Sequence, residues 1–359
     1  MAITASMVKE LREMTGAGMM DCKKALTETN GDMDAAVDVL RKSGAAKMEK
    51  KASRIAAEGI ARVATNGTEA VVAEVNSETD FVAKNEVFQE FVQTVADTAL
   101  ASGLNGGANG EDVEAVLATG GLQDLLVEKT ATIGEKLSFR RFAKVSGDCV
   151  ATYLHGGGKI GVLVAATGAS GDAEKEALVN VAMQVAAMNP QYVGRADISQ
   201  AEIDKMRDIT VDSSLNDPAS LPKPILNALF AKVVDGKLFS DEDFAAYEEK
   251  KNDKYLFNFL SDAAKATLAD LAMQDKANIV ADKIFGGMIE GRISKQLKEI
   301  SLLDQVYVKA EDGKQTVGKY LESVNKELTI AKFIRFEVGE GMEKKNEDFA
   351  AEVAAQMNA

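Results

Sequence analysis

Few residues of this sequence have the type and spacing that covalent catalysis requires. His155 is the only histidine among 359 residues, and it opens the segment His-Gly-Gly-Gly-Lys. A phosphate-binding loop of the Walker type needs a longer spacing before its lysine, then Ser or Thr, and then a helix. Here Ile160 follows Lys159 and the sequence continues as a strand, so we interpret the glycines as a hairpin turn. No candidate nucleophile accompanies His155, and we do not expect it to be catalytic.

A different kind of chemistry, recognition of a partner protein, is indicated by Asp80 and Phe81. They lie in the stretch Glu-Val-Asn-Ser-Glu-Thr-Asp-Phe-Val-Ala-Lys, residues 74–84. Small and β-branched residues before the pair predict a strand. Apolar residues at three- and four-residue steps after it predict a helix, with Asn85 as its N-cap and Thr79 as a second candidate cap upstream. Periodicity alone would place Phe81 on the buried face of that helix.

An internal repeat argues against a core role for the pair. Residues 61–76 and residues 150–166 both read strand, turn, strand, and a predicted helix follows each of them. After the second hairpin the sequence has Thr-Gly-Ala-Ser-Gly where the first has Glu-Thr-Asp-Phe. The repeated unit therefore closes without an acid and an aromatic side by side. We interpret Asp80 and Phe81 as a probe that enters a partner protein.

Composition limits the classes of protein that remain. The net charge is −14, which disfavours a general nucleic-acid binder because such proteins present a basic face. Cys22 and Cys149 lie far apart without metal-ligand spacing, as is typical of a reducing compartment. The sequence has no run of about 18 apolar residues and no apolar signal core at its start. We expect a cytoplasmic protein that needs no cofactor or metal and contacts neither membrane nor nucleic acid.

The predicted fold class is α+β. Residues 1–54 should form three short helices, the first capped by Thr4 or Ser6 and the third by Asp32. The second hairpin's helix should carry an apolar face made of Leu178, Val181, Val185 and Met188. Strands are predicted at 306–309 and 332–338 with a helix at 317–325 between them, and Asn346 can cap a final helix. The predicted domains are a helical module at 1–54, core subdomains at 55–145 and at 146–194 with 288–340, a helical insertion at 195–287, and a C-terminal module at 341–359.

Two long stretches resemble a known family. Residues 11–26, Leu-Arg-Glu-Met-Thr-Gly-Ala-Gly-Met-Met-Asp-Cys-Lys-Lys-Ala-Leu, are similar to the N-terminal signature of elongation factor Ts. Residues 74–84 are similar to the second signature of that family, and residues 336–341 are similar to its C-terminal part. The resemblance covers nearly the whole chain except its middle.

The resemblance implies a function without catalysis. Family members are guanine-nucleotide exchange factors for elongation factor Tu, a translational GTPase. A ubiquitin-associated-like module at the N-terminus would contact the GTPase domain. The second signature would intrude near the nucleotide, where the phenylalanine enters an apolar pocket and its neighbours disturb the Mg²⁺ site. The partner-binding residues implied in this way are Arg12, Met19, Met20 and Lys23 in the N-terminal module, and Thr79, Asp80, Phe81 and Val82 in the intruding segment.

The sequence is compatible with further functions and contacts. The insertion at 195–287 would correspond to a coiled-coil protrusion, which family members use for partner contact or for a homodimer, but it is larger than we expect. A non-catalytic adaptor that binds its partner through residues 1–54 alone is the alternative function. An enzyme is disfavoured, because the sequence has no metal cluster, nucleophile elbow or phosphate loop.

Overall fold

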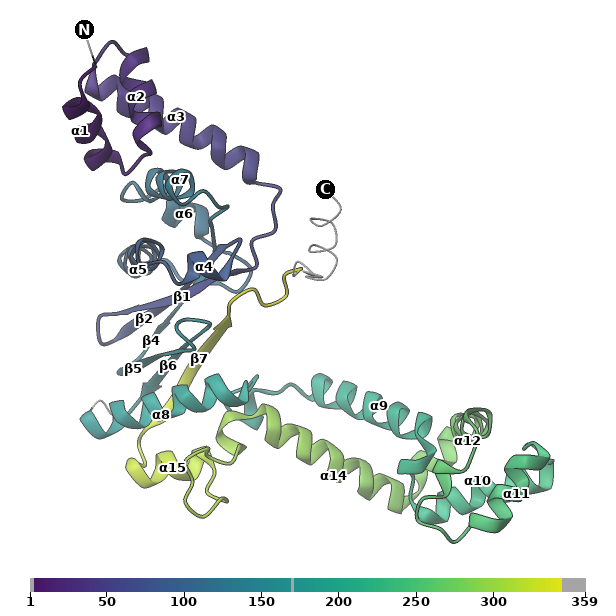
Figure 1. Ribbon diagram of the computed structural model, residues 1–359. Coiled ribbons are helices and arrows are strands. Elements are labelled where there is room, and N and C mark those ends of the chain that lie inside the picture. Colours follow the sequence, from purple (N-terminus) through teal and green to yellow (C-terminus); the bar gives the residue numbers. More distant parts are fainter. Residues whose placement is uncertain (1–2, 169–170, 344–359) are drawn as a thin grey trace. The chain divides into compact units, whose positions relative to one another are not determined.

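The protein, described here by a computed structural model for residues 3–168 and 171–343, divides into two compact units. Unit 1 comprises Met1–Asn189 and Val306–Ala359, and unit 2 is Pro190–Gln305. Unit 2 is therefore an insertion in the chain of unit 1. The mixture of helices with two small antiparallel sheets confirms the α+β class (Figure 1).

The N-terminal part of unit 1 is a three-helix bundle, as predicted. Its helices are α1 (Ala5–Thr15), α2 (Met19–Glu28) and α3 (Met33–Lys51). The side chains of Thr4 and Asp32 accept backbone N–H groups at the starts of α1 and α3, and Gly16 ends α1 with φ +64°. The buried residues of the bundle are Val8, Leu11, Cys22, Ala25, Leu26 and Ala36. Its likeness to a ubiquitin-associated module stays a prediction.

Each sheet of unit 1 is built on a hairpin, to which the first sheet adds two strands and the second sheet adds one. The strand orders are β1-β2-β4-β3 and β5-β6-β7, and every pair is antiparallel. Both predicted hairpins are present, β1–β2 and β5–β6. The strands of the first sheet are β1 (Glu58–Thr65), β2 (Glu69–Ser77), β3 (Gly106–Gly107) and β4 (Ser138–Ser146). Those of the second are β5 (Cys149–His155), β6 (Ile160–Thr167) and β7 (Thr329–Glu337).

The two sheets face each other and carry helices on their outer faces (Figure 1). Helix α5 (Glu86–Ala101) packs on β1 and β2, and α8 (Asp172–Met188) packs on β5 and β6. The stripe predicted on α5 is buried throughout, from Phe88 to Ala99. Between the sheets lies a core of Ala61, Ala70, Val72, Ala143, Val145, Leu163, Ala165 and Phe336. Further helices of unit 1 are α4 (Asp80–Ala83), α6 (Val113–Leu117), α7 (Leu122–Ile133) and α15 (Val317–Val324).

One predicted strand of unit 1 is wrong. On α8 the predicted face is buried at Leu178, Val181 and Val185, while Met188 at the helix end is 50% exposed. Residues 306–309 do not form a strand, and only Val306 makes an isolated bridge, to Thr316. The Gln184 side chain explains this difference: it donates to the carbonyl of Val306 and accepts from the N–H of Val308. A side chain of α8 thus takes the backbone groups that a neighbouring strand would have used.

Unit 2 is helical and has a hydrophobic core of its own. Its helices are α9 (Gln200–Asn216), α10 (Lys223–Gly236), α11 (Asp241–Lys250), α12 (Asp262–Gln274), α13 (Lys276–Ala281) and α14 (Lys283–Ile300). Its two ends are joined, because Gln191 N–H donates to Ile300 O and Leu302 N–H donates to Tyr192 O.

The predicted division into five domains is finer than the two units, and its boundaries stay predictions. The edge predicted between 287 and 288 falls within α14. The coiled-coil character of the insertion also stays a prediction. The predicted final helix that begins at Asn346 lies outside the described residues.

A buried carboxylate ties β2 to β4 and to the chain after β7. Glu74 is completely buried, and its Oε1 accepts from Arg140 Nη1 and from the N–H of Gly339, both at 2.9 Å. Its Oε2 accepts from Arg141 Nε at 2.5 Å, and the Arg141 guanidinium lies 4.1 Å from the ring centre of Phe336. Asn76 Nδ2 also donates to Oε1, at 3.2 Å, so four donors compensate the lost hydration of the carboxylate.

Gly339 fits this arrangement because it lacks a side chain. Its φ is +74°, and a Cβ there would come within 2.2 Å of the carbonyl oxygen of Ala57. Only glycine thus lets the backbone approach Glu74 this closely.

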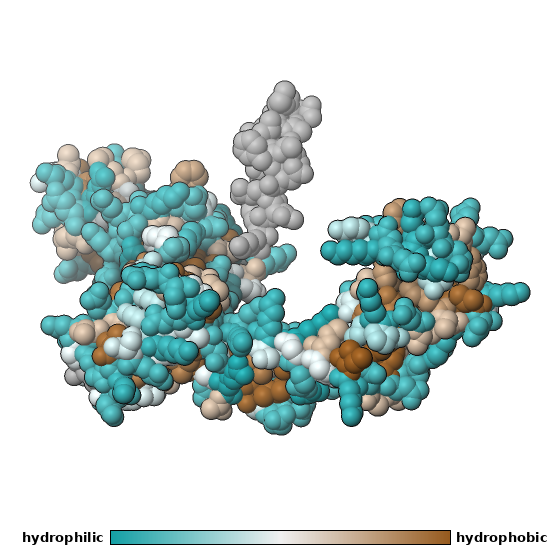
Figure 2. Space-filling view, turned by 90° about the horizontal axis from the view of Figure 1, so that it is seen from below, coloured by the Kyte–Doolittle hydropathy of each residue, from teal (hydrophilic) through white to brown (hydrophobic). Residues whose placement is uncertain are grey.

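The surface of the protein is mainly polar. In Figure 2 the visible face is mainly hydrophilic, and the apolar areas are small and separated from one another. Apolar side chains that are strongly exposed are therefore worth considering one by one.

The Glu74 network predicts a large stability effect. Glu74→Gln would remove the buried counter-charge of Arg141, which is only 5% exposed, and leave it only the half-exposed Glu340; the free energy of unfolding should fall by about 3 kcal/mol. Urea denaturation followed by circular dichroism would measure the change. Glu13→Gln is the control, because Glu13 pairs with Lys9 at the surface and should cost less than about 0.5 kcal/mol. Equal effects of the two variants would contradict the assignment.

Candidate functional site

Phe81 protrudes from the single helical turn α4 between β2 and α5. Its side chain is 80% exposed, the largest fraction among the large hydrophobic residues that the structure describes. The prediction from periodicity that Phe81 continues the buried stripe is therefore wrong. Helix α4 ends at Lys84, and α5 begins after Asn85, whose side chain caps it. Because the two helices are not continuous, Phe81 is out of phase with the buried face of α5. Its exposure leaves the ring available to a partner.

Asp80 and Lys84 flank the exposed ring. Asp80 Oδ2 accepts from Lys84 Nζ at 2.7 Å, and this hydrogen bond holds the pKa of Asp80 below its ordinary value. The Lys84 ammonium lies 6.0 Å from the ring centre of Phe81. Both charged groups are largely in water, so the ion pair contributes little to stability. We call Asp80 and Phe81 the tip.

The turn under the tip is fixed by side chains on both of its sides. Thr79 Oγ1 accepts from the N–H of Val82 at 3.5 Å and so caps α4, and Ser77 Oγ donates to the carbonyl of Thr79. On the inner side Val82 packs against the hydrophobic core and Ala83 is buried. Among the four predicted residues of this segment, Asp80 and Phe81 point outward, while Thr79 and Val82 hold the turn.

Sequence reasoning missed Glu135, which also holds this turn. Its carboxylate accepts from the N–H groups of Glu78 and Thr79, both at 3.0 Å, and from Thr79 Oγ1 at 2.6 Å. Glu135 follows Gly134, the residue that ends α7. It is far from Thr79 in the sequence, and no local pattern signals the contact.

The N-terminal residues that the resemblance implied are all exposed. Arg12 is on α1, and Met19, Met20 and Lys23 are on α2. Met20 is 74% exposed and Met19 57%. Two exposed methionines at the start of one helix form an adaptable apolar surface. They belong to the helical bundle, whereas the tip belongs to the first sheet.

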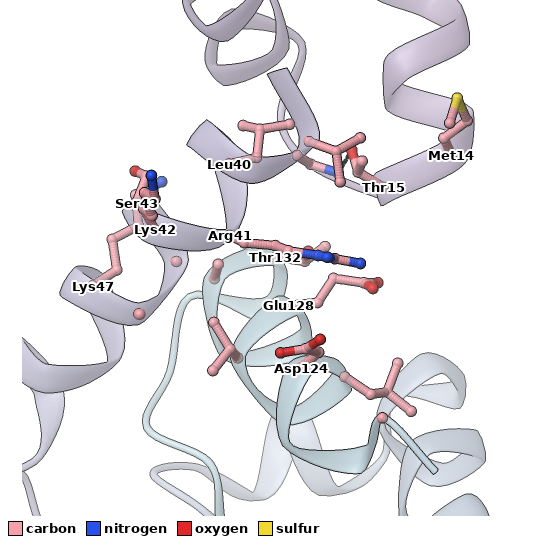
Figure 3. A pocket seen from close by; sticks show the side chains of 18 of the residues that line it. Met14, Thr15, Leu40, Arg41, Lys42, Ser43, Lys47, Asp124, Glu128 and Thr132 are labelled. Atoms are coloured by element: carbon pink, nitrogen blue, oxygen red, sulfur yellow. Dashed lines mark hydrogen bonds between the residues drawn. The ribbon is translucent and has the colours of Figure 1, made fainter. Parts of the chain in front are cut away.

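A groove of about 650 Å³ runs between the bundle and α7. Figure 3 shows Arg41 of α3 extending into this space, with Asp124 and Glu128 of α7 directed toward it. The lining mixes both charges with apolar side chains such as Leu40. At its closed side Gly44 of α3 packs on α7, so we interpret the groove as the edge of a packing contact.

Features that would indicate other chemistry are missing from the part of the chain that the structure describes. No group of three or more potential metal ligands occurs there. His155 is exposed, and its ring nitrogen lies 3.1 Å from the hydroxyl of Tyr153. None of the helices in the described ranges is long and apolar enough to cross a bilayer.

Two phenylalanines on neighbouring helices differ in exposure, and their replacement should therefore change the free energy of unfolding by very different amounts. Phe88 is completely buried, so Phe88→Ala should lower the free energy of unfolding by about 3–5 kcal/mol. Phe81→Ala removes no core contact and should change it by less than about 0.5 kcal/mol. Urea denaturation of the two variants tests the difference. A strongly destabilised Phe81 variant would mean that the ring packs inside the protein.

The chain matches a family model whose description is elongation factor TS. The match covers residues 78–340, well over half of the chain, and includes the tip and all of unit 2. It begins at Glu78, so the helical bundle with its signature lies before the matched part. Members of this family are nucleotide exchange factors of translation elongation. By this match, the chain belongs to the elongation factor Ts family.

Proposed function

We propose that this protein accelerates the release of GDP from elongation factor Tu by inserting Phe81 into that GTPase. The observation that carries the proposal is the exposed ring of Phe81 on a turn that is held from both sides, in a chain that belongs to this family. A rigid aromatic side chain that is exposed in the free protein fits the role of an anchor for an apolar pocket.

Exchange of this kind needs no covalent chemistry. If the factor binds the nucleotide-free GTPase more tightly than the GDP-bound form, GDP must bind the complex more weakly by the same factor. The energy comes from contacts made only when the nucleotide site has rearranged.

Within the partner, the Mg²⁺ ion is the target we propose for residues 79–82. Mg²⁺ neutralises phosphate charge, and its octahedral shell depends on closely placed oxygen ligands. Insertion of Phe81 with the ionised Asp80 beside it would displace the groups that hold this shell. A weakened shell raises the dissociation rate of GDP.

A second contact is proposed for the helical bundle. Arg12 and Lys23 provide positive charge, and Met19 and Met20 provide an exposed apolar surface. We assign this ubiquitin-associated-like module to binding the GTPase domain, with the tip acting on the nucleotide site. The proposed setting is the cytoplasm, without direct contact to nucleic acid. A homodimer through the helices of unit 2 remains a prediction that analytical ultracentrifugation would test.

Release of a fluorescent GDP analogue from purified elongation factor Tu tests the function. The parent protein should accelerate release strongly, and Phe81→Ala should reduce the accelerated rate by about 30-fold, the effect of losing a binding hot spot of about 2 kcal/mol. Phe259→Ala is the matched control, since Phe259 is 49% exposed but lies in unit 2.

The outcomes separate the proposal from its alternatives. No acceleration by the parent protein would contradict exchange activity and favour an adaptor that binds through the bundle. Acceleration that Phe81→Ala leaves intact would retain the activity but reject the insertion of Phe81.

A further inference from the structure

The tip belongs to a helix that is too short to be stable without tertiary contacts. Helix α4 has four residues, and a single turn gains too few hydrogen bonds to offset the ordering of its backbone. The burial of Ala83 fixes its end, but not the residues that precede Asp80. The direction in which the tip points must therefore be set by contacts to residues 78 and 79.

Two glutamates make these contacts in a reciprocal way. The Glu135 carboxylate accepts from the backbone of Glu78 and Thr79 and from the Thr79 hydroxyl. In return, Glu78 Oε1 accepts from the N–H of Lys136 at 2.6 Å and from Arg54 Nη1 at 3.1 Å. Each acid thus binds the backbone of the segment that carries the other. We call Glu78 and Glu135 the clamp.

The Thr79 hydroxyl connects the clamp to α4. It donates its hydrogen to Glu135 and accepts the N–H of Val82, so one group links the clamp to the first turn of the helix. A glutamate accepts at both of its oxygens, whereas a glutamine would turn an NH₂ group toward one of the donors. The clamp accordingly depends on the charge of Glu135 as well as on its length.

We propose that Glu135 is a positioning residue, which holds the Asp80–Phe81 tip in one orientation before the partner is met. The consequence for exchange rests on the proposed function above. An anchor that is already ordered loses less conformational freedom on binding, so more of its contact energy is available to displace the nucleotide. Glu135 itself need not touch the partner.

The first experiment uses the protein alone. In Glu135→Gln, amide hydrogen exchange of the peptide that spans residues 78–82 should accelerate by about tenfold, because charge-assisted hydrogen bonds close this turn. The melting temperature should stay within about 3 °C of the parent value, since no core side chain changes. Unchanged hydrogen exchange in this peptide would overturn the proposal.

Glu111→Gln is the matched control. Glu111 is also a loop glutamate whose carboxylate accepts from a neighbour, Asn109, but it is remote in sequence from the tip and makes no bond to it. This variant should leave hydrogen exchange at residues 78–82 at the parent rate. Acceleration in both variants would show a general loosening and would also overturn the proposal.

The second experiment measures GDP release with Glu135→Gln, Phe81→Ala and the double variant. Glu135→Gln alone should lower the maximal release rate by about fivefold, and in the Phe81→Ala background it should change the rate by less than about twofold. Equal effects in the two backgrounds would show that Glu135 does not act through the tip. Parent protein without activity would refute the proposed function, while the hydrogen-exchange result would still decide whether Glu135 positions the turn.

Discussion

The buried carboxylate of Glu74 is the constraint on which unit 1 depends. An unpaired charge in this position would be prohibitively unfavourable, so the strands and the turn around it must supply donors at fixed places. The donors come from β4, from Asn76 on the same strand and from the backbone at Gly339, which follows β7. One residue of β2 therefore fixes both its neighbouring strand and the segment after β7.

The same strand leads into the tip. Three residues after Glu74 the β2 strand ends at Ser77, and the chain turns into α4. An apolar ring directed into water would gain free energy by folding back onto the core. Here the polar groups of the turn are bonded inward, to Glu135 and to the backbone, and the ring is left outside. Because the turn below the tip is ordered while the ring makes no core contact, the ring stays available to a partner.

Much of the fold could be predicted from local patterns. The caps at Thr4, Asp32 and Asn85 were recognisable because a side-chain acceptor before an apolar stripe defines a helix start. Both hairpins followed from alternating apolar runs around turn residues. The pattern also suggested Asp80 and Phe81 as a site, although periodicity taken alone placed Phe81 in the core.

What the sequence concealed depends on contacts between distant residues. Glu135 gives no local signal, because an isolated glutamate after a helix resembles any surface acid. The missing strand at 306–309 depends on Gln184, more than a hundred positions earlier, whose amide replaces a strand partner. The partners of Glu74 were similarly hidden, since an acid within a β-strand pattern does not reveal which donors will surround it.

The joined ends of unit 2 determine how strongly the length of this insert affects the stability of unit 1. Because Tyr192 and Leu302 are bonded to each other, unit 1 is connected as if by a short loop, whatever number of residues lies between them. The entropic cost of closing a flexible loop grows only with the logarithm of its length. An insert that folds around its own core and brings its ends together lowers this cost further. A change in the length of this insert should therefore cost little in the stability of the sheets that carry the tip.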